Sequence, residues 1–515
     1  MTAATDAPVR HLPPRTAWAA PLSAARLLRL ELRRNAMPWI LLPIAALFWF
    51  DSYRPGAATP PIWVLRTFWN MGQGHTIIDF GPFVAGVAAW MGSRDGRRRT
   101  ADLVTATSRP RYAAQLATWA ATAGWAAGAY LAFVGVLFGV YAHQGLQGSP
   151  PWWWVAVGAA AVTAFSAAGF TIGALYPSRF AAPVAAFGGF LAMTMSSQTG
   201  FSHASGWALI LPTNSNGNYQ PVSGIFYPYL PDLPIARVMF LAGIAVVALG
   251  LLGLPASAGG PLLRRAAAVV TLAGVAVAGT AVGLAATARL EPHGMVIPAL
   301  HDTANDRPIS YTPVCGRATG VPVCLNRAYR SLMPDVTAAL RPMLGEVAGL
   351  PGAPARATQV GGAYSSTEGE AGQAMTISGH PPVLSMALDA ENLPGVFGGT
   401  PALFAAQLRL LFAHAFVGAG DGAGTPAQQA VQAALLQGAG VPFARQPRML
   451  ASLGLPSWAL ATVHSAGGHG PGRATGPVYA AARRLAALSP AARHAWLASH
   501  LPALQAGLLP LAQLP

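Results

Sequence analysis

Long apolar runs dominate the first half of the chain, and short polar segments separate them. Seven such runs precede residue 289, at about 36–50, 76–92, 113–141, 152–176, 181–197, 235–254 and 266–288. An α-helix needs about 20 mostly apolar residues to cross the hydrocarbon core of a bilayer. Four of the runs reach that length, whereas the first, the second and the fifth are short. We expect about seven transmembrane helices.

The pattern changes after Arg289, where apolar positions recur in short segments separated by Gly and Pro. Residues 290–311 are expected to form a Pro-punctuated linker, and alternation over about 356–390 predicts two or three strands. Helical periodicity marks 326–350, 403–417, 426–437, 445–453, 474–488 and 491–508. The expected fold is a polytopic α-helical membrane protein with a C-terminal soluble α+β domain. Its parts are an N-terminal arm with an interfacial helix (1–35), a transmembrane domain (36–288) and the soluble domain (289–515).

Arginine is distributed unevenly among the connecting segments. Residues 1–288 contain 18 arginines, and 15 of them fall in segments that seven spans would place on one membrane side. Arg54, Arg66 and Arg237 fall on the other side. Since excess positive charge in short loops marks the cytoplasmic face, we expect the N-terminus inside and the C-terminal domain outside. A plasma-membrane, multi-pass protein follows, whereas six or eight spans would place an arginine cluster outside.

Composition supports a membrane location. Hydrophobic residues make up 53% of the chain and charged residues 10%. The net charge of +15 is also compatible with nucleic-acid binding, but most of the surplus flanks the predicted spans, with 18 arginines against 7 acids before residue 289. We therefore expect contacts with anionic lipid headgroups and no nucleic-acid partner.

An amphipathic helix is expected over residues 17–35, before the first span. Arg26, Arg29 and Arg33 share one face, and Leu28 and Leu32 share another. Such a helix can lie in the membrane interface. A plain cytoplasmic extension of the first span fits the pattern equally well.

The two cysteines, Cys315 and Cys324, both lie in the region expected outside the membrane. The glycines and the proline between them allow the chain to turn back. We expect a disulfide, because secreted and extracytoplasmic segments meet oxidising conditions. Closing this loop would contribute about 2.7 kcal/mol in the chain-entropy model.

One carboxylate falls inside a predicted span. Asp79 lies about one turn inside the second run, so it is a candidate intramembrane polar site. Hydration or local capping near the outer membrane face explains it as well. The long connection 198–234 either covers a substrate exit or is a plain structured loop.

The sequence gives little support for an enzymatic function of this chain. A phosphate-binding P-loop needs lysine, and the chain has none. A zincin helix needs Glu and His where Ala415 and Gly418 follow His414. His464 and His469 stand alone in a glycine-rich loop, and no Gly-x-Ser-x-Gly elbow occurs. We expect no catalytic residue, no bound metal and no cofactor in this chain.

The segment 92–112 carries a family resemblance. Asp95 and Gly96 end the second span, Leu103 and Val104 follow, and Ser108 to Arg111 form a Pro/Ser/Arg element. This order resembles the loop after the second span of ABC-2-type transporter permeases, although the usual acid there is Glu. The interfacial helix before the first span also matches that layout.

The resemblance implies a six-helix bundle whose cytoplasmic loop couples to a separate nucleotide-binding ATPase subunit, which would bind the ATP. The coupling residues would be Arg94, Asp95, Arg97, Arg98, Arg99, Arg109 and Arg111. A homo- or heterodimer of permease subunits, working as an exporter, is the expected assembly. The seventh span and the last domain resemble domains appended to actinobacterial permease-like proteins.

Two other functions stay open. One alternative is a membrane-anchored extracytoplasmic binding or assembly protein without transport activity, in which the arginine-rich loop only sets orientation. A degenerate membrane peptidase is a third reading, and it would need a metal.

Overall fold

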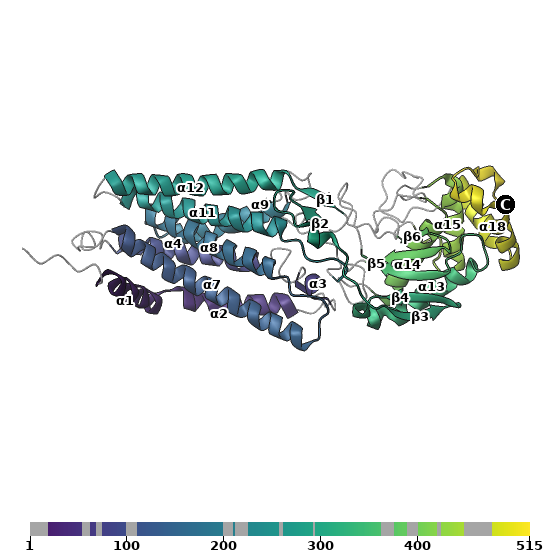
Figure 1. The fold of residues 1–515 in the computed structure, drawn as a ribbon, viewed down its shortest axis with the longest axis horizontal. Helices are drawn as coiled ribbons and strands as arrows, with labels where there is room; N and C mark the ends of the chain where they lie inside the picture. Colours follow the sequence, from purple (N-terminus) through teal and green to yellow (C-terminus); the bar gives the residue numbers. More distant parts are fainter. Residues whose placement is uncertain are drawn as a thin grey trace, which may run out of the picture.

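The computed structural model describes residues 19–53, 62–67, 75–98, 111–198, 210–211, 225–256, 261–291, 294–361, 375–388, 400–419, 424–446 and 476–515. Figure 1 shows an elongated molecule with a bundle of long helices in one half and an α/β domain in the other. The C-terminus lies in the α/β domain, far from the bundle (Figure 1).

The long helices of the bundle lie side by side along the long axis (Figure 1). The helices before residue 289 are α1 (Ala19–Arg34), α2 (Met37–Tyr53), α3 (Trp63–Thr67), α4 (His75–Gly92), α5 (Arg94–Arg97), α7 (Arg111–His143), α8 (Trp152–Leu175), α9 (Ala181–Gln198), α11 (Asp232–Ala256) and α12 (Pro261–Ala286). Helix α1 lies at one end, here called the α1 end. Helix α12 leads into the β-strands at the opposite end, here called the sheet end (Figure 1).

Four described helices are long and apolar enough to cross a membrane: Arg111–His143, Trp152–Leu175, Asp232–Pro255 and Pro261–Ala286. The apolar parts of α2, α4 and α9 are shorter, at Met37–Phe50, Phe80–Gly92 and Ala181–Thr194. By length and composition, the described helices therefore include four candidate membrane spans rather than the seven that we expected. A helix of about 14 residues rises only about 21 Å, which is less than the hydrocarbon thickness of about 30 Å.

Small residues allow the central helices to approach closely. A side-chain Cβ at Gly169 or Gly173 of α8 would lie about 2 Å from the carbonyl oxygens of Ala85 and Ala89 in α4, at 2.2 and 2.0 Å. Small residues spaced by four are typical of tightly packed membrane helices. Gly243 of α11 is packed in the same way against Gly274 of α12, so both helix pairs depend on the absence of a side chain.

The C-terminal domain contains a five-stranded mixed sheet in the order β3-β4-β5-β7-β6. Its strands are β3 (Val314–Ala318), β4 (Val321–Leu325), β5 (Arg356–Val360), β6 (Met375–Ser378) and β7 (Val383–Ala387). The β4–β5 and β5–β7 pairs are parallel, and the two outer pairs are antiparallel. The other elements are β1 (Arg289–Glu291), β2 (Gly294–Val296), the 3-10 helix Arg327–Leu332, α13 (Met333–Glu346), α14 (Pro401–Phe416), α15 (Pro426–Gly438), α17 (Pro477–Ala487) and α18 (Pro490–Gln505).

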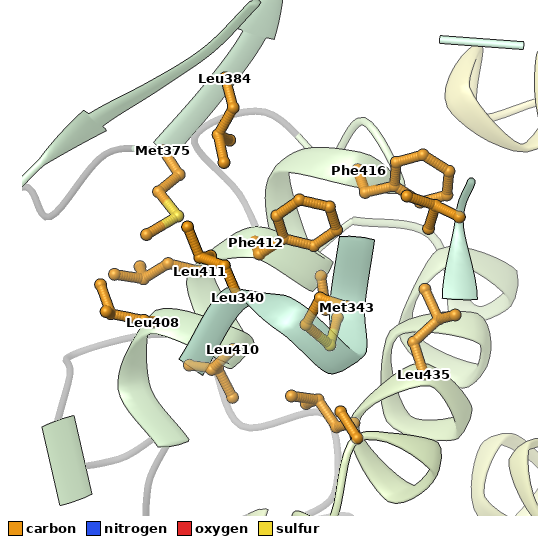
Figure 2. Packing of buried hydrophobic residues seen from close by; sticks show 14 of the residues in the cluster. Leu340, Met343, Met375, Leu384, Leu408, Leu410, Leu411, Phe412, Phe416 and Leu435 are labelled. Carbon is orange, nitrogen blue, oxygen red and sulfur yellow. The ribbon is translucent and has the colours of Figure 1, made fainter. Parts of the chain in front are cut away.

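The core of this domain lies between the sheet and the helices α13, α14 and α15. Figure 2 shows Leu340 and Met343 of α13 close to Phe412 of α14, with Leu384 of β7 above them. These four side chains are fully buried. Burial of each contributes about 1.5–3 kcal/mol, so the helices are held on the sheet mainly by the hydrophobic effect.

Several expectations for this region are confirmed and one is wrong. The disulfide joins Cys315 and Cys324, which face each other across the β3–β4 hairpin. Three strands occupy the predicted stretch, and α14, α15, α17 and α18 begin within three residues of their expected positions. The predicted linker 290–311 instead opens with the β1–β2 hairpin, whose strands are too short to show alternation. Most of the expected helix 445–453 lies outside the described residues.

Candidate functional site

Helix α1 is fixed to the bundle at the α1 end by polar contacts. The Trp125 indole N–H of α7 donates to the Leu32 carbonyl oxygen at 2.9 Å. The Asn35 amide donates to the Thr122 hydroxyl at 2.9 Å, and its carbonyl accepts from the Met37 N–H at 2.9 Å. Asn35 therefore caps α2 while holding α7. The junction between α1 and α2 cannot shift without moving α7.

A salt bridge connects α1 to α5, the short helix that follows α4. Arg94 donates from both terminal nitrogens to the two carboxylate oxygens of Glu31, each at 3.0 Å. Glu31 is 7% exposed, and Asp95 lies 3.4 Å from the Arg94 Nε. Burial by itself lowers the pKa of the Arg94 guanidinium, but the hydrogen bonds and charges of Glu31 and Asp95 raise that pKa above its usual value. Bidentate geometry makes this pair stronger than an ordinary surface ion pair.

Arg97 folds back on the end of α4. Its guanidinium lies 3.4 Å from the centroid of the Trp90 ring and donates to the Trp90 carbonyl oxygen at 2.9 Å. Its Nε donates to the Ser93 hydroxyl at 3.0 Å. Burial and then the charge of Arg98 lower the pKa of Arg97. Arg97 thus serves the local structure, whereas Arg98 is exposed.

Helix α5 also rests on the connection between α8 and α9. A Cβ at Gly96 would lie 2.4 Å from the Pro177 Cβ, and a Cβ at Gly92 would lie 2.2 Å from the Phe170 carbonyl oxygen. No side chain fits at either position. The α4–α5 corner is therefore in direct contact with α1 through Glu31, with α8 through Gly92, and with the α8–α9 connection through Gly96.

The structure separates the predicted coupling residues into three groups. Arg94, Asp95 and Arg97 are engaged in the contacts given above. Arg98 is exposed, and Arg111 is half-buried at the start of α7. Arg99 and Arg109 lie outside the described residues. Glu31, Asn35 and Thr122 were missed by sequence reasoning, although Glu31 is the sole acid of α1, among four arginines.

The other candidates are only partly placed. Asp79 lies in α4, but its side chain is outside the described part of the chain. His414 is a half-buried residue of α14, and His464 and His469 lie outside the described residues. Among the described residues, no group of three or more His, Cys, Asp or Glu is arranged to hold a metal ion.

A second polar cluster, also missed from the sequence, lies at the sheet end. The His301 Nδ1 lies 3.1 Å from the Asp232 carboxylate, and its Nε2 lies 2.9 Å from the Asp306 carboxylate. Asp232 is fully buried and accepts the Ile297 N–H at 3.0 Å. Burial by itself lowers the pKa of His301, but the two carboxylates raise it above its usual value. The cluster ties the segment after β2 to the start of α11.

An apolar cavity of about 240 Å³ lies between α8, α9 and α11. Its lining includes Phe165, Met193, Leu211 and Phe240. A cavity of this character excludes water and accepts nonpolar groups. The described residues of its lining carry no charge that could orient a ligand.

Comparisons of the chain with protein-family models, with curated proteins and with solved structures found no match. Function is therefore inferred from the residues and their geometry.

Proposed function

We propose that this chain is the transmembrane subunit of an ABC-type exporter of the ABC-2 permease kind, coupled through residues 92–112 to a separate ATPase subunit. The ATPase subunit would bind and hydrolyse ATP. The permease subunits would work as a homo- or heterodimer in contact with membrane lipids.

The observation that carries this proposal is the connected corner formed by α1, α4, α5 and α8. Glu31 and Arg94 join α1 to α5, and Gly96 packs against Pro177. A displacement of α5 would therefore move α1, α4 and α8 together as a rigid body. The exposed Arg98 is available to an acidic groove on a soluble partner.

The proposal includes seven spans, with the shorter α2, α4 and α9 crossing beside the four long helices. Short apolar helices can be accommodated by local bilayer thinning and by snorkelling flanking residues. The arginine distribution supports a topology with the N-terminus and the α1 end in the cytoplasm and the C-terminal domain on the outer side of the plasma membrane. The C-terminal domain would take part in substrate handling on the outer side of the membrane.

Charge reversal at Arg98 tests the proposal. The full-length chain, tagged and purified in detergent from its own membranes, should bring with it a subunit that hydrolyses ATP. Arg98→Glu should reduce the co-purified ATPase activity at least about tenfold, because a repelled charge at the interface weakens association. Arg29→Glu, at an exposed position of α1, is the matched control and should retain the activity.

The same experiment distinguishes the transporter subunit from the alternative function. A membrane-anchored binding protein without transport activity would bring no ATPase, and Arg98→Glu would leave its outer partner bound. Absence of ATP hydrolysis from the wild-type preparation would reject the transporter proposal.

A further inference from the structure

The short helix α3 closes the bundle at the sheet end. The Trp63 N–H donates to the Gln147 carbonyl oxygen at 3.0 Å, and Ile62 pairs with Gln147 in an isolated β-bridge. The Trp63 ring makes edge contacts with Phe138 and Tyr141 of α7. Ile62 and Trp63 are buried, so α3 is a fixed part of the bundle.

This helix buries a cation, Arg66, that has no salt bridge to any carboxylate of the described residues. Arg66 is 4% exposed, and its Nε has neither solvent access nor a hydrogen-bond partner. Its guanidinium lies 5.3 Å from the centroid of the Tyr141 ring. Cation–π contact offsets part of the desolvation cost but accepts no N–H hydrogen bond.

Two hydroxyl groups next to Arg66 are also unpaired. The Tyr53 hydroxyl, at the end of α2, interacts electrostatically with Arg66 and has no hydrogen-bond partner. The Thr67 hydroxyl, on the neighbouring residue, is fully buried and likewise unpaired. Buried polar groups are normally hydrogen-bonded, so the unpaired Arg66 Nε and the Tyr53 hydroxyl that interacts with it point to a further acceptor at this position.

The chemistry of the donors defines the acceptor. A guanidinium presents a planar fork that matches the oxygens of a carboxylate or phosphate, and two hydroxyls can donate to further oxygens. Trp49 and Trp152 are exposed near this position, since the Trp49 ring packs on Tyr53 and the Trp152 ring packs on Phe138, which also contacts Trp63. Tryptophans gather at the level of lipid headgroups. Lipid phosphates are the abundant hydrogen-bond acceptors at the headgroup level of a membrane.

We propose that Arg66, with the hydroxyls of Tyr53 and Thr67, binds a phosphate group, and that this group belongs to a lipid headgroup of the outer membrane interface. The site is far from α5, and its existence does not depend on the transporter proposal. Free inorganic phosphate has the same oxygens and is the other source of the ligand.

The test uses the full-length protein, stripped of lipid in an uncharged detergent, and follows its thermal unfolding. Dioctanoyl phosphatidylglycerol should raise the unfolding temperature in a saturable manner, and dioctanoylglycerol, which lacks the phosphate, should not. Sodium phosphate is compared with sodium chloride at equal ionic strength. A rise with sodium phosphate but not with the phospholipid would assign the site to free phosphate and overturn the lipid assignment.

Two variants tie the effect to the site. Arg66→Met should weaken apparent affinity for the phospholipid at least about tenfold, and Tyr53→Phe about two- to tenfold. Arg66→Met should still fold, because it removes an unpaired buried charge and replaces the stem of the arginine by an unbranched apolar side chain. Arg330→Gln, at an exposed position of the C-terminal domain, should leave the affinity unchanged. The proposal is overturned if neither phosphate probe raises the unfolding temperature of the wild type. It is also overturned if the phospholipid raises the unfolding temperature of Arg66→Met as much as that of the wild type.

Discussion

At the scale of single residues, the buried charges of this protein lie where helices meet other segments. Glu31 and Arg94 join α1 to α5, and Asp232 joins α11 to the segment after β2. Removing one partner of a buried pair leaves the other charge desolvated and uncompensated. Each pair therefore makes a local arrangement of the chain specific as well as stable.

Glu31→Gln should lower the free energy of unfolding by about 1.5–3 kcal/mol, because Arg94 loses a charged, bidentate acceptor. Unfolding in mixed detergent micelles measures the loss. Arg29→Gln, at an exposed position of the same helix, should change stability by less than about 0.5 kcal/mol. In the double mutant with Arg94→Gln the two losses should not add, since both remove one interaction. Additive losses would contradict the pairing.

The raised pKa of His301 determines the direction in which the free energy of unfolding changes with pH. Its pKa is raised in the folded protein, so the protonated form is favoured by folding. This contribution is complete below the unfolded pKa of about 6.5 and is lost as the pH rises through the folded pKa. Between pH 6 and pH 9 the wild type should therefore lose more stability than His301→Gln. The exposed His143→Gln should follow the wild type, and parallel curves for wild type and His301→Gln would refute the assignment.

At the scale of elements, the sequence pattern predicts helices well and their contacts poorly. The apolar runs specify where α7, α8, α11 and α12 lie, because length and hydropathy are local properties. The close approach of α4 and α8 depends on which small residues face each other across two helices, which no single run reveals. The β1–β2 hairpin was missed for a related reason, since its strands have three residues each.

Gly173→Leu tests the close packing of α4 on α8. A Cβ at this position would lie 2.0 Å from the Ala89 carbonyl oxygen, so the helices must separate. We expect a loss of at least about 3 kcal/mol and a strong decrease in monodisperse protein on size-exclusion chromatography. Gly139→Leu on α7 is the matched control, because a side chain there meets nothing within 4 Å. Equal behaviour of the two variants would show that the packing is wrong.

At the scale of the whole molecule, the bundle and the C-terminal domain are joined by more than the chain connection. The Ile309 N–H donates to the Phe226 carbonyl oxygen at 2.7 Å, and the rings of Phe226 and Tyr311 are in edge contact at 5.2 Å. Phe226 is buried and belongs to the core of the C-terminal domain. A displacement of the bundle at the sheet end is therefore transmitted to that domain.

The location of the candidate coupling corner was predictable, but its internal contacts were not. Arginine counts and the short motif drew attention to residues 92–112, although the short helix α5 itself was not predicted. The partner Glu31 lies 63 residues away along the chain, and its pairing depends on how α1 returns to the bundle. Likewise, the two unpaired hydroxyls around Arg66 can be recognised only once the helices are placed.

We propose that Arg98 and the C-terminal domain lie on opposite sides of the membrane, and labelling of single cysteines with a membrane-impermeant maleimide tests this proposal most directly. Cys315 and Cys324 are paired in the disulfide, so an introduced thiol is the reactive one. Arg330→Cys, at an exposed position of the C-terminal domain, should react in intact spheroplasts. Arg98→Cys should react only after permeabilisation. Labelling of Arg98→Cys in intact spheroplasts, with Arg330→Cys protected, would contradict the account.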